Sequence, residues 1–191
     1  MPASAPVIEL EHVRLRPLRA ADAESLQIHL SHPAVTERTS FPEISPALVD
    51  GMIGRAQSRW AAGEPSRWAV ALRQDDQLIG TCGFNEWSAV HRWAEMAFDL
   101  TPLWWGKGVM RQSVAAALGW IFEQELAERV QALVRIDNLR SRGLLERSGF
   151  VREGCLKSFR ICRGQRHDFH LYAVLGPDWL AAREKFPAAS G

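Results

Sequence analysis

The sequence predicts a mixed α/β domain with a mostly antiparallel central sheet, one parallel pair of strands, and flanking helices. Residues 68–72 and 78–84 are apolar segments joined by the turn-forming sequence Gln-Asp-Asp-Gln, which is typical of an antiparallel hairpin. Residues 93–136 run as strand, loop, helix and strand, a crossover that makes two strands parallel. Residues 46–60 repeat apolar side chains at helical spacing, which predicts an amphipathic helix.

The elements before the hairpin are a strand and two helices. Alternating apolar and charged residues at 13–16 predict the strand. Asp22 is expected to cap a short helix, because its side chain can accept a hydrogen bond from a free amide of the first turn. Ser45 followed by Pro46 is a stronger helix start, and Gly63 offers a stop after that helix.

The second half of the chain continues to alternate between strands and helices. One helix should follow the glycine at position 108. A second should run from its N-cap, Asn138, to Gly149, which can take the left-handed conformation that ends a helix. Further strands are expected at residues 93–100, 130–136, 150–156 and 167–175.

Length and composition bound the class of protein. With 191 residues, 47% of them apolar, the chain can bury a sizeable core; we expect one domain at residues 13–176 between tails at 1–12 and 177–191. No apolar run reaches the ~18 residues that cross a bilayer, and no secretory signal is recognisable, so no membrane partner is expected. Three scattered cysteines form neither a disulfide framework nor a metal motif, which favours a reducing cytoplasm and no metal.

Charge is unevenly distributed along the chain, although the net charge is only +1. Residues 1–128 carry a formal charge of −5 and residues 129–168 a formal charge of +6. A basic segment can attract the phosphates of a cofactor or a nucleic acid, or it can be a solvated face. An RNA-binding module is therefore one alternative function, but the chain has no recognisable RNA-binding motif, and nucleic acid is not the partner we expect.

The loop Trp105-Gly106-Lys107-Gly108 is the first candidate for chemistry. Glycine lets the backbone approach a ligand closely, and the first amides of the following helix are unpaired donors. Together with the helix dipole they make a site for a phosphate or diphosphate, to which Lys107 and Arg111 add positive charge. The loop lacks the further residues of a P-loop and of a dinucleotide fingerprint, so an ATPase and a nicotinamide dehydrogenase are poor interpretations.

The segment from Leu100 to Met110, Leu-Thr-Pro-Leu-Trp-Trp-Gly-Lys-Gly-Val-Met, resembles the acyl-CoA-binding loop of the GCN5-related N-acetyltransferases (GNAT). Within that family it is most similar to the branch of the ribosomal-protein N-acetyltransferases (RimJ/RimL-like). Weaker family motifs occur along the chain in the order that the family has. They are Leu15-Arg-Pro-Leu, Ile79-Gly and His91-Arg-Trp-Ala-Glu before the loop, and Asn138-Leu-Arg-Ser and Ser148-Gly-Phe after it. The resemblance implies an N-acetyltransferase that takes acetyl-CoA as its acyl donor.

The resemblance also implies which residues bind acetyl-CoA. Two strands would splay apart, one ending near Leu100 and the other beginning near Arg129, and the pantetheine arm would hydrogen-bond the free backbone of the first. The diphosphate would lie on the amides of residues 106–111. The implied cofactor-binding residues are Phe98, Asp99, Leu100, Trp105, Gly106, Lys107, Gly108, Val109, Met110, Arg111, Asn138, Ser141 and Arg147.

Two positions depart from the family pattern. Met110 stands where the family loop has glycine or alanine, which can alter the close approach of the backbone while leaving the amide in place. Leu145 stands where many members have a tyrosine. In the ribosomal branch a serine three residues after the asparagine is thought to do related work, and Ser141 occupies that place.

Acyl transfer to an amine needs a base for the amine proton and a donor that protonates the leaving thiolate. Glu95 is the first candidate for the base, because alternation places it on the polar face of its strand; it could instead be an exposed partner of Arg92. Ser141 could protonate the thiolate, or could simply belong to the first turn of a helix. A backbone amide near Leu100 would meet the oxyanion.

Glu86, Trp87 and His91 are the candidates for binding the acceptor, because they lie where the chain enters the strand of Glu95, and Glu86 and His91 are also the second candidates for the base. The acceptor is expected to be a primary amine, either a protein N-terminus or a small molecule. No nucleophile motif is recognisable, so the amine should attack directly in a ternary complex. A non-catalytic acyl-CoA-binding sensor of the same fold is the main alternative, and a homodimer is left open.

Overall fold

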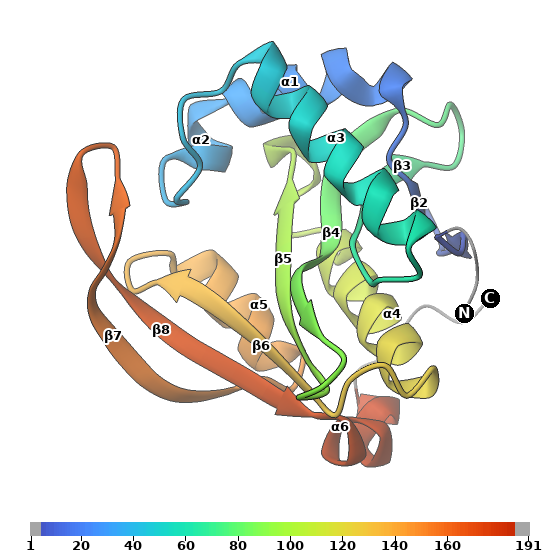
Figure 1. The fold of residues 1–191 in the computed structure, drawn as a ribbon, viewed down its shortest axis with the longest axis vertical. Helices are drawn as coiled ribbons and strands as arrows, with labels where there is room; N and C mark the ends of the chain where they lie inside the picture. The colour runs from blue at the N-terminus through green and yellow to red at the C-terminus, as the bar shows by residue number, and fades with distance from the viewer. Residues whose placement is uncertain (1–4, 186–191) are drawn as a thin grey trace.

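The computed structural model describes residues 5–185, whose strands form one eight-stranded sheet (Figure 1). The strand order is β1-β2-β3-β4-β5-β6-β8-β7, and of the paired strands only β5 and β6 run parallel. The strands are β1 (Ile8–Glu9), β2 (Val13–Pro17), β3 (Arg67–Leu72), β4 (Leu78–Ser88), β5 (Trp93–Leu100), β6 (Arg129–Arg135), β7 (Val151–Cys162) and β8 (Gln165–Leu175). The predicted fold class is confirmed.

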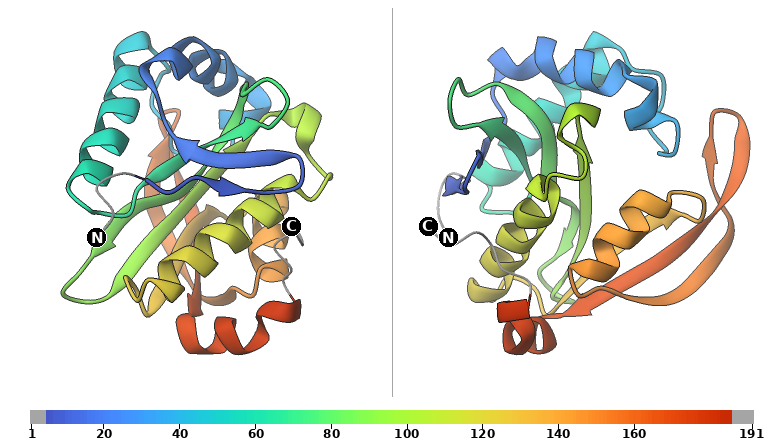
Figure 2. Two further views of the ribbon diagram at one scale, coloured as in Figure 1. Left: turned by 90° about the vertical axis from the view of Figure 1, so that its right-hand side faces the viewer. Right: turned by 180° about the vertical axis from the view of Figure 1, so that it is seen from behind.

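Helices cover both faces of this sheet (Figure 2). They are α1 (Ala23–Ser31), α2 (Pro33–Thr36), α3 (Pro46–Ala61), α4 (Val109–Glu123), α5 (Leu139–Arg147) and α6 (Gly176–Ala182). Successive residues of a strand point to opposite faces, and along β3 Ala69 joins the core under α1 and α3, whereas Trp68 and Val70 join the core under α4. The sheet therefore separates two hydrophobic cores.

Two of the three predicted capping hydrogen bonds are present. The Ser45 hydroxyl accepts a hydrogen bond from the amide of Leu48 at 3.3 Å, and the Asn138 side chain accepts one from Ser141 at 3.2 Å. Asp22 is the N-cap residue of α1 as predicted, but its side chain makes no capping hydrogen bond there; the buried carboxylate instead accepts two 2.8 Å hydrogen bonds from the Arg16 guanidinium and one from the Arg19 amide. Leaving the charge of a buried arginine without a carboxylate costs more free energy than leaving a helix amide uncapped. The Asp22 carboxylate therefore pairs with Arg16.

The parallel strands β5 and β6 separate soon after they meet, as Figure 1 shows. They pair over only three positions, the last of which joins Glu95 to Gln131. Beyond that point β5 continues along β4 as far as Leu100, and β6 continues along β8 as far as Arg135. Each strand thus keeps its antiparallel neighbour and leaves a gap that opens toward the loop before α4.

The fold extends past both expected boundaries. Before residue 13, β1 pairs with β2 and the side chains of Ala5 and Leu10 are buried. After residue 176, α6 packs on β8 and α4, and the buried Trp179 ring lies 5.9 Å from that of Phe122. The expected tails are therefore too long, because single apolar residues in polar segments have no periodicity that would place them in the core.

The hairpin of β7 and β8 is longer than the two strands predicted there. It reaches a turn at residues 163–164, and its pairing passes from Leu156 opposite Phe169 directly to Arg160 opposite His167. Residues 157–159 therefore bulge opposite a single residue of β8, which interrupts the alternation on which the prediction relied. The far end of the hairpin curves toward the loop between α2 and α3 (Figure 1).

Candidate active site

The loop between β5 and α4 presents a run of unpaired backbone amides. The amide of Trp105 donates to Pro102 and that of Gln112 to Gly108, whereas the amides of residues 106–111 donate to no protein oxygen within residues 5–185. The helix α4 begins at Val109, so the positive end of its dipole lies among these donors. Such a run at a helix start can bind a phosphate or a diphosphate.

Gly106 and Gly108 give the loop its shape. Their φ angles are +75° and +80°, in the left-handed region that glycine enters without strain. A Cβ atom built at either glycine meets no atom within 4 Å, so the space beside the loop is open. A side chain at either position would both strain the backbone and occupy part of that space.

A cavity of about 280 Å³, here called the loop cavity, adjoins this loop. One side comes from the end of β5 and the loop itself, and the other from the start of α5. The Trp105 indole N–H donates to the Leu100 carbonyl at 2.7 Å, and the Arg140 guanidinium stacks 3.5 Å from the Trp105 ring centroid. This stack joins the two sides of the cavity.

Most of the residues predicted to bind the cofactor line the loop cavity. They are Phe98, Asp99, Leu100, Trp105, Gly106, Gly108, Met110, Arg111, Asn138, Ser141 and Arg147. Lys107 and Val109 do not line it: the Lys107 ammonium lies 4.9 Å from the ring of Trp104, and the Val109 side chain is buried in the core. Their amides still belong to the unpaired run.

The facing edges of β5 and β6 are open along the gap. Residues 96–100 of β5 and 132–135 of β6 have no strand partner on that side. Backbone groups away from water require hydrogen-bond partners, so a ligand with amides of its own can be held there. The open edges, the unpaired amides and the arginines of the loop cavity (Arg38, Arg111, Arg140 and Arg147) fit the amide-containing arm and the phosphates of an acyl-CoA.

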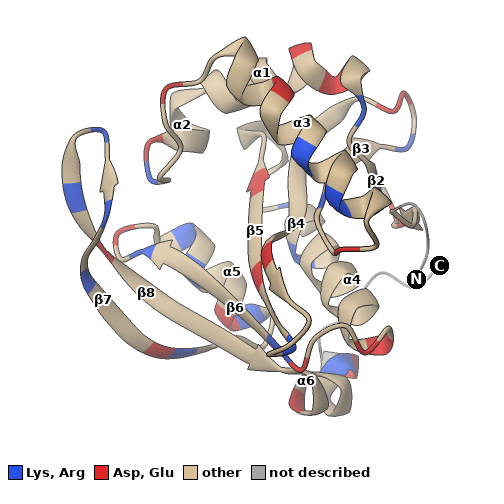
Figure 3. Cartoon of the chain, in the orientation of Figure 1, with Lys and Arg blue, Asp and Glu red and all other residues tan. Residues whose placement is uncertain are grey.

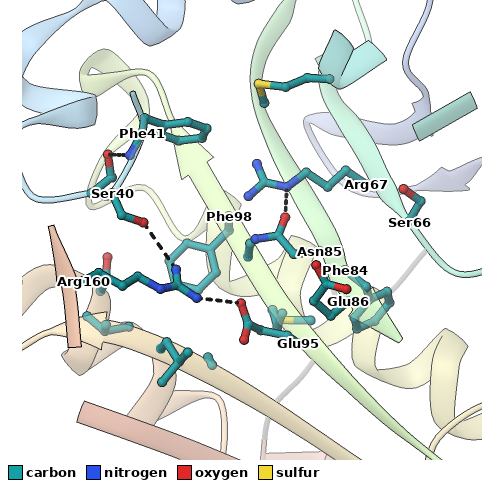
Figure 4. Close-up of a pocket in the computed structure, with 18 of the residues that line it drawn as sticks. Ser40, Phe41, Ser66, Arg67, Phe84, Asn85, Glu86, Glu95, Phe98 and Arg160 are labelled. Carbon is teal, nitrogen blue, oxygen red and sulfur yellow. Dashed lines mark hydrogen bonds and ion pairs between the residues drawn. The ribbon is translucent and has the colours of Figure 1, made fainter. Parts of the chain in front are cut away.

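A second cavity of about 460 Å³, here called the sheet cavity, lies in the gap between the strands. Its walls come from β4, β5, β6 and α3, from the loop after α2, and from the end of β7 (Figure 4). The residues that line both cavities are Arg38, Thr39, Phe98, Asn138 and Ser141. The two cavities therefore meet beside the open edge of β5.

Glu95 lies where β5 and β6 separate and faces the sheet cavity (Figure 4). It is 8% exposed, and its Oε1 lies 3.6 Å from Nη2 of Arg160. Burial raises the pKa of Glu95; the charge of Arg160 opposes this and that of Glu86 adds to it, with the net result that the pKa is raised. The alternative pairing with Arg92 does not occur, because Arg92 pairs with Glu128.

Ser141 occupies the first turn of α5, where both cavities meet. Its amide donates to the side chain of Asn138. Its hydroxyl forms no hydrogen bond with any of residues 5–185, and the residue is half-buried. The hydroxyl is thus free to bond a ligand, and the cap at Asn138 fixes its position.

The carboxylate of Asp99 is turned into a buried network behind the site. It bonds His29 at 2.8 Å, Thr81 at 2.7 Å and Arg67 at 2.9 Å. Burial by itself would raise the pKa of Asp99, but the hydrogen bonds and charges of His29 and Arg67, with the Thr81 hydroxyl, lower it to about 2. Only the backbone of Asp99 is left to meet a ligand.

The three residues predicted to bind the acceptor are placed differently from one another. Glu86 is opposite Glu95 in the β4–β5 pairing and lines the sheet cavity. The Trp87 indole donates to the Leu126 carbonyl at 2.9 Å, and the residue lines neither cavity. His91 is exposed in the turn before β5 and also lines neither cavity.

None of the six arginines that line the sheet cavity is a candidate site residue from the sequence, and three of them show why. Arg55 comes from α3, Arg67 from β3 and Arg160 from β7. Arg55 and Arg160 lie in segments that mix charged and apolar residues, and Arg67 begins an apolar strand, so no local pattern distinguishes any of them from a solvated arginine. Only the folding of three separate elements around one cavity brings them together.

A splayed α/β sheet with an anion-binding loop beside the splay defines a protein that binds an acyl-CoA. Residues 12–151 match the family described as acetyltransferase (GNAT) domain, and the chain belongs to this family. The resemblance drawn from the loop is thereby confirmed. The protein is an N-acetyltransferase that uses acetyl-CoA to acetylate amines.

Named relatives agree with this assignment. The N-acetyltransferase p20 of Bacillus licheniformis is 30% identical over 168 residues, which cover 86% of this chain and 93% of the relative. The [ribosomal protein uS5]-alanine N-acetyltransferase of Escherichia coli (strain K12) is 30% identical over 110 residues, which cover 57% of each chain. A solved structure of RimL, a ribosomal L7/L12 α-N-protein acetyltransferase in complex with coenzyme A, has the same fold, with a TM-score of 0.80 at 19% identity over 89% of this chain and 98% of that chain.

Within residues 5–185 no helix is both long and apolar enough to cross a membrane. The same part of the chain holds no group of three or more His, Cys, Asp or Glu side chains placed to share a metal ion.

Proposed function

We propose that the loop cavity holds acetyl-CoA and that the sheet cavity holds the acceptor amine. The observation that carries this proposal is that the two cavities meet at Phe98, Asn138 and Ser141, beside the open edge of β5. A thioester extended along that edge would meet an amine that enters from the other cavity. The transfer is then a direct attack in a ternary complex, as predicted from the lack of a nucleophile motif.

Glu95 acts as the base in this proposal. The reaction forms a C–N bond and breaks the C–S bond; the neutral amine nitrogen loses one proton as the thiolate sulfur gains one, and an acceptor that arrives as an ammonium first gives a further proton to Glu95, which passes it to water. An amine is mostly a cation in neutral water and has no lone pair to attack with until a base removes a proton. Glu95 supports this role by its position in the wall of the sheet cavity, its burial and its raised pKa.

Ser141 is the proposed donor to the thiolate. Its hydroxyl is unpaired within the described chain, and it lies where the cavities meet. An O–H group held at this point can donate to the sulfur as the C–S bond breaks. The open backbone edge near Leu100 supplies the amide that would meet the carbonyl oxygen.

The acceptor is a primary amine, and both a protein N-terminus and a small molecule are compatible with the proposal. The similarity to enzymes named for ribosomal proteins supports a RimJ/RimL-like assignment. We also propose a cytoplasmic location, which is supported by three cysteines that form no disulfide.

The proposal is tested by thiol release from acetyl-CoA with a panel of peptides and small amines. Glu95→Gln should lower kcat by about a hundredfold or more, the range for removal of a general base. Ser141→Ala should also lower kcat. It should leave the affinity for CoA within about twofold, because the run of unpaired amides at residues 106–111 is unchanged. Glu123→Gln, which removes an exposed glutamate at the end of α4, is the matched control.

Two results would contradict the proposal in different ways. Clear CoA binding with no thiol release for any amine would show an acyl-CoA-binding sensor. A loss of activity in Glu86→Gln with full activity in Glu95→Gln would move the base to the opposite strand.

A further inference from the structure

Arginine is the most abundant charged residue around the sheet cavity. Six lining residues are arginines and two are glutamates, and the lining set includes no lysine and no aspartate. In Figure 3 the blue bands on α3 and along β7 lie on two sides of the gap beside β5. The arginines are Arg38, Arg55, Arg59, Arg67, Arg135 and Arg160. Arginines in the wall would repel an acceptor that carries only positive charge.

Four of these arginines are balanced by acids that do not line the cavity. The ion pairs, with N–O separations from 2.6 to 3.4 Å, are Arg38–Glu37, Arg59–Glu64, Arg67–Asp99 and Arg135–Asp137. Arg55 pairs with no residue in the described part of the chain. Arg160 has only Glu95, which itself belongs to the cavity. Two arginines are therefore left for a ligand.

The lining charges that remain are two of each sign, of which Arg55 and Glu86 are exposed to solvent and Glu95 is buried. The positive ones are Arg55 and Arg160, and the negative ones are Glu86 and Glu95, which lie opposite each other on β4 and β5. A polyamine would gain from the two acids and lose as much to the two arginines. A molecule with one ammonium and one carboxylate can satisfy both kinds of charge at once.

The β7–β8 hairpin holds Arg160 at the edge of this cavity. Asp168 accepts hydrogen bonds of 2.8 Å from the Ser158 amide and from Lys157, and so fixes the bulge that precedes Arg160. The guanidinium lies 5.3 and 5.7 Å from the rings of Phe159 and Phe169. Its position is thus set by its own hairpin.

The polar contacts of Arg160 across the gap are long. Nη1 lies 3.3 Å from the Ser40 hydroxyl and Nη2 lies 3.6 Å from Glu95, as Figure 4 shows. A guanidinium that binds a carboxylate with two parallel N–H donors does so at about 2.7–2.9 Å. Arg160 therefore has donors that a ligand carboxylate would satisfy better than the protein does.

We propose that the acceptor is a small amino acid, whose carboxylate binds Arg160 while its amine lies at Glu95. This inference rests on the proposed function and narrows its acceptor. Glu95 and Arg160 lie 3.6 Å apart, so an amine and a carboxylate separated by one carbon can lie alongside the pair, the amine at Glu95 and the carboxylate at Arg160. A cavity of 460 Å³ has the size of a small-molecule site, and Arg55 is left to bind an anionic side chain.

The inference is tested with acceptors matched in all but charge. Thiol release is measured for the twenty amino acids, for their carboxamides and for the corresponding decarboxylated amines, and binding of the same compounds is measured by calorimetry in the presence of CoA. With the wild type, kcat/KM and affinity should fall by about tenfold or more from an accepted acid to its amide, as expected for loss of a hydrogen bond between charged groups.

Variants of Arg160 assign the effect to that residue. Arg160→Gln should abolish the preference for the acid over the amide, and Arg160→Lys should restore part of it. Arg152→Gln removes the same charge from an exposed position on the same strand and should keep the preference.

The outcomes separate this inference from the proposed function. Turnover of peptide N-termini, polyamines or amides as fast as of amino acids would overturn the inference and leave the acetyltransferase assignment intact. Binding of amino acids that depends on Arg160, without thiol release for any amine, would overturn the catalytic proposal and with it the role of the amino acid as acceptor, and would leave only a binding site for amino acids. A preference for the acid over the amide that survives in Arg160→Gln would also overturn the inference about the acceptor.

Discussion

At the scale of single residues, Glu95 and Arg160 act on each other. The two side chains lie 3.6 Å apart on β5 and β7, between which the sheet places β6 and β8, and both line the same cavity. Burial makes Glu95 a better base by raising its pKa, and the nearby guanidinium limits that rise. A ligand that draws Arg160 away would therefore strengthen the base at the moment an amine is bound.

This coupling predicts the direction of a pKa change. Arg160→Gln removes a positive charge that stabilises the ionised form of Glu95, so the pKa of Glu95 should rise above its wild-type value, which is itself above the ordinary 4.5. The side-chain carboxyl carbon, followed by NMR as pH is varied in the free protein, reports this value directly. Arg152→Gln should leave it in place, and an unmoved pKa in Arg160→Gln would contradict the coupling.

At the scale of elements, the turn before α4 is the part of the site that local sequence specifies. Its two glycines take left-handed φ angles, and the next residues begin a helix whose first amides have no partner within the described chain. These features depend on neighbouring residues alone, which is why they can be predicted. By contrast, the bulge in β7 depends on Asp168, across the hairpin.

Replacing one of these glycines should weaken CoA binding. Gly108→Ala places a Cβ on a backbone with φ of +80°, at a strain of about 1 kcal/mol or more, and beside the open space of the anion site. We expect the Kd for CoA, measured by calorimetry, to rise by about tenfold. Gly54→Ala makes the same change on the exposed face of α3, where it should leave Kd unchanged and raise Tm slightly. Equal Kd values in the two variants would argue against CoA binding at the amides of residues 106–111.

At the scale of the whole molecule, a buried network ties the helical layer to the sheet. Asp99 of β5 receives hydrogen bonds from Arg67 of β3, Thr81 of β4 and His29 of α1, and His29 also reaches Thr101 after β5. Asp99 belongs to the part of β5 that has no pairing with β6, so the network holds the free end of that strand. It supports the site without contributing a reacting group.

The stability that Asp99 contributes should depend on pH in a defined window. Its pKa is about 2 when folded and 3.8 ordinarily, so its contribution is complete above pH 3.8 and is lost as pH falls toward 2. The shift corresponds to about 2 kcal/mol. Urea unfolding at several pH values should show Asp99→Asn less stable than the wild type at pH 7, with the difference narrowing below about pH 4. A difference that stays constant down to pH 3 would contradict this role; Asp50→Asn, at an exposed position of α3, controls for the loss of one acid.

Much of the fold follows from patterns within short segments. The hairpin of β3 and β4, the crossover through α4 and the caps at Ser45 and Asn138 are predicted correctly, since each depends on residues close together in the chain. Asp22 was assigned to a helix cap because the pattern cannot reveal a buried arginine partner such as Arg16. The bulge in β7 was missed for the same reason: its partner lies on the other strand.

The candidate site divides along the same line. The loop at residues 105–111, with Asn138, Ser141 and Glu95, could be named from the sequence because glycine spacing, helix starts and strand alternation are local properties, and the resemblance to a family added their order. The charged residues around Glu95 could not be predicted from the sequence. Arg55, Arg67 and Arg160 come from three different elements, and the first and last of them are 105 positions apart in the chain (160 − 55). Their charges act on the cavity only when the side chains are close to it in space. Arg160 comes close to Glu95 only after the hairpin of β7 and β8 has folded beside the gap between β5 and β6.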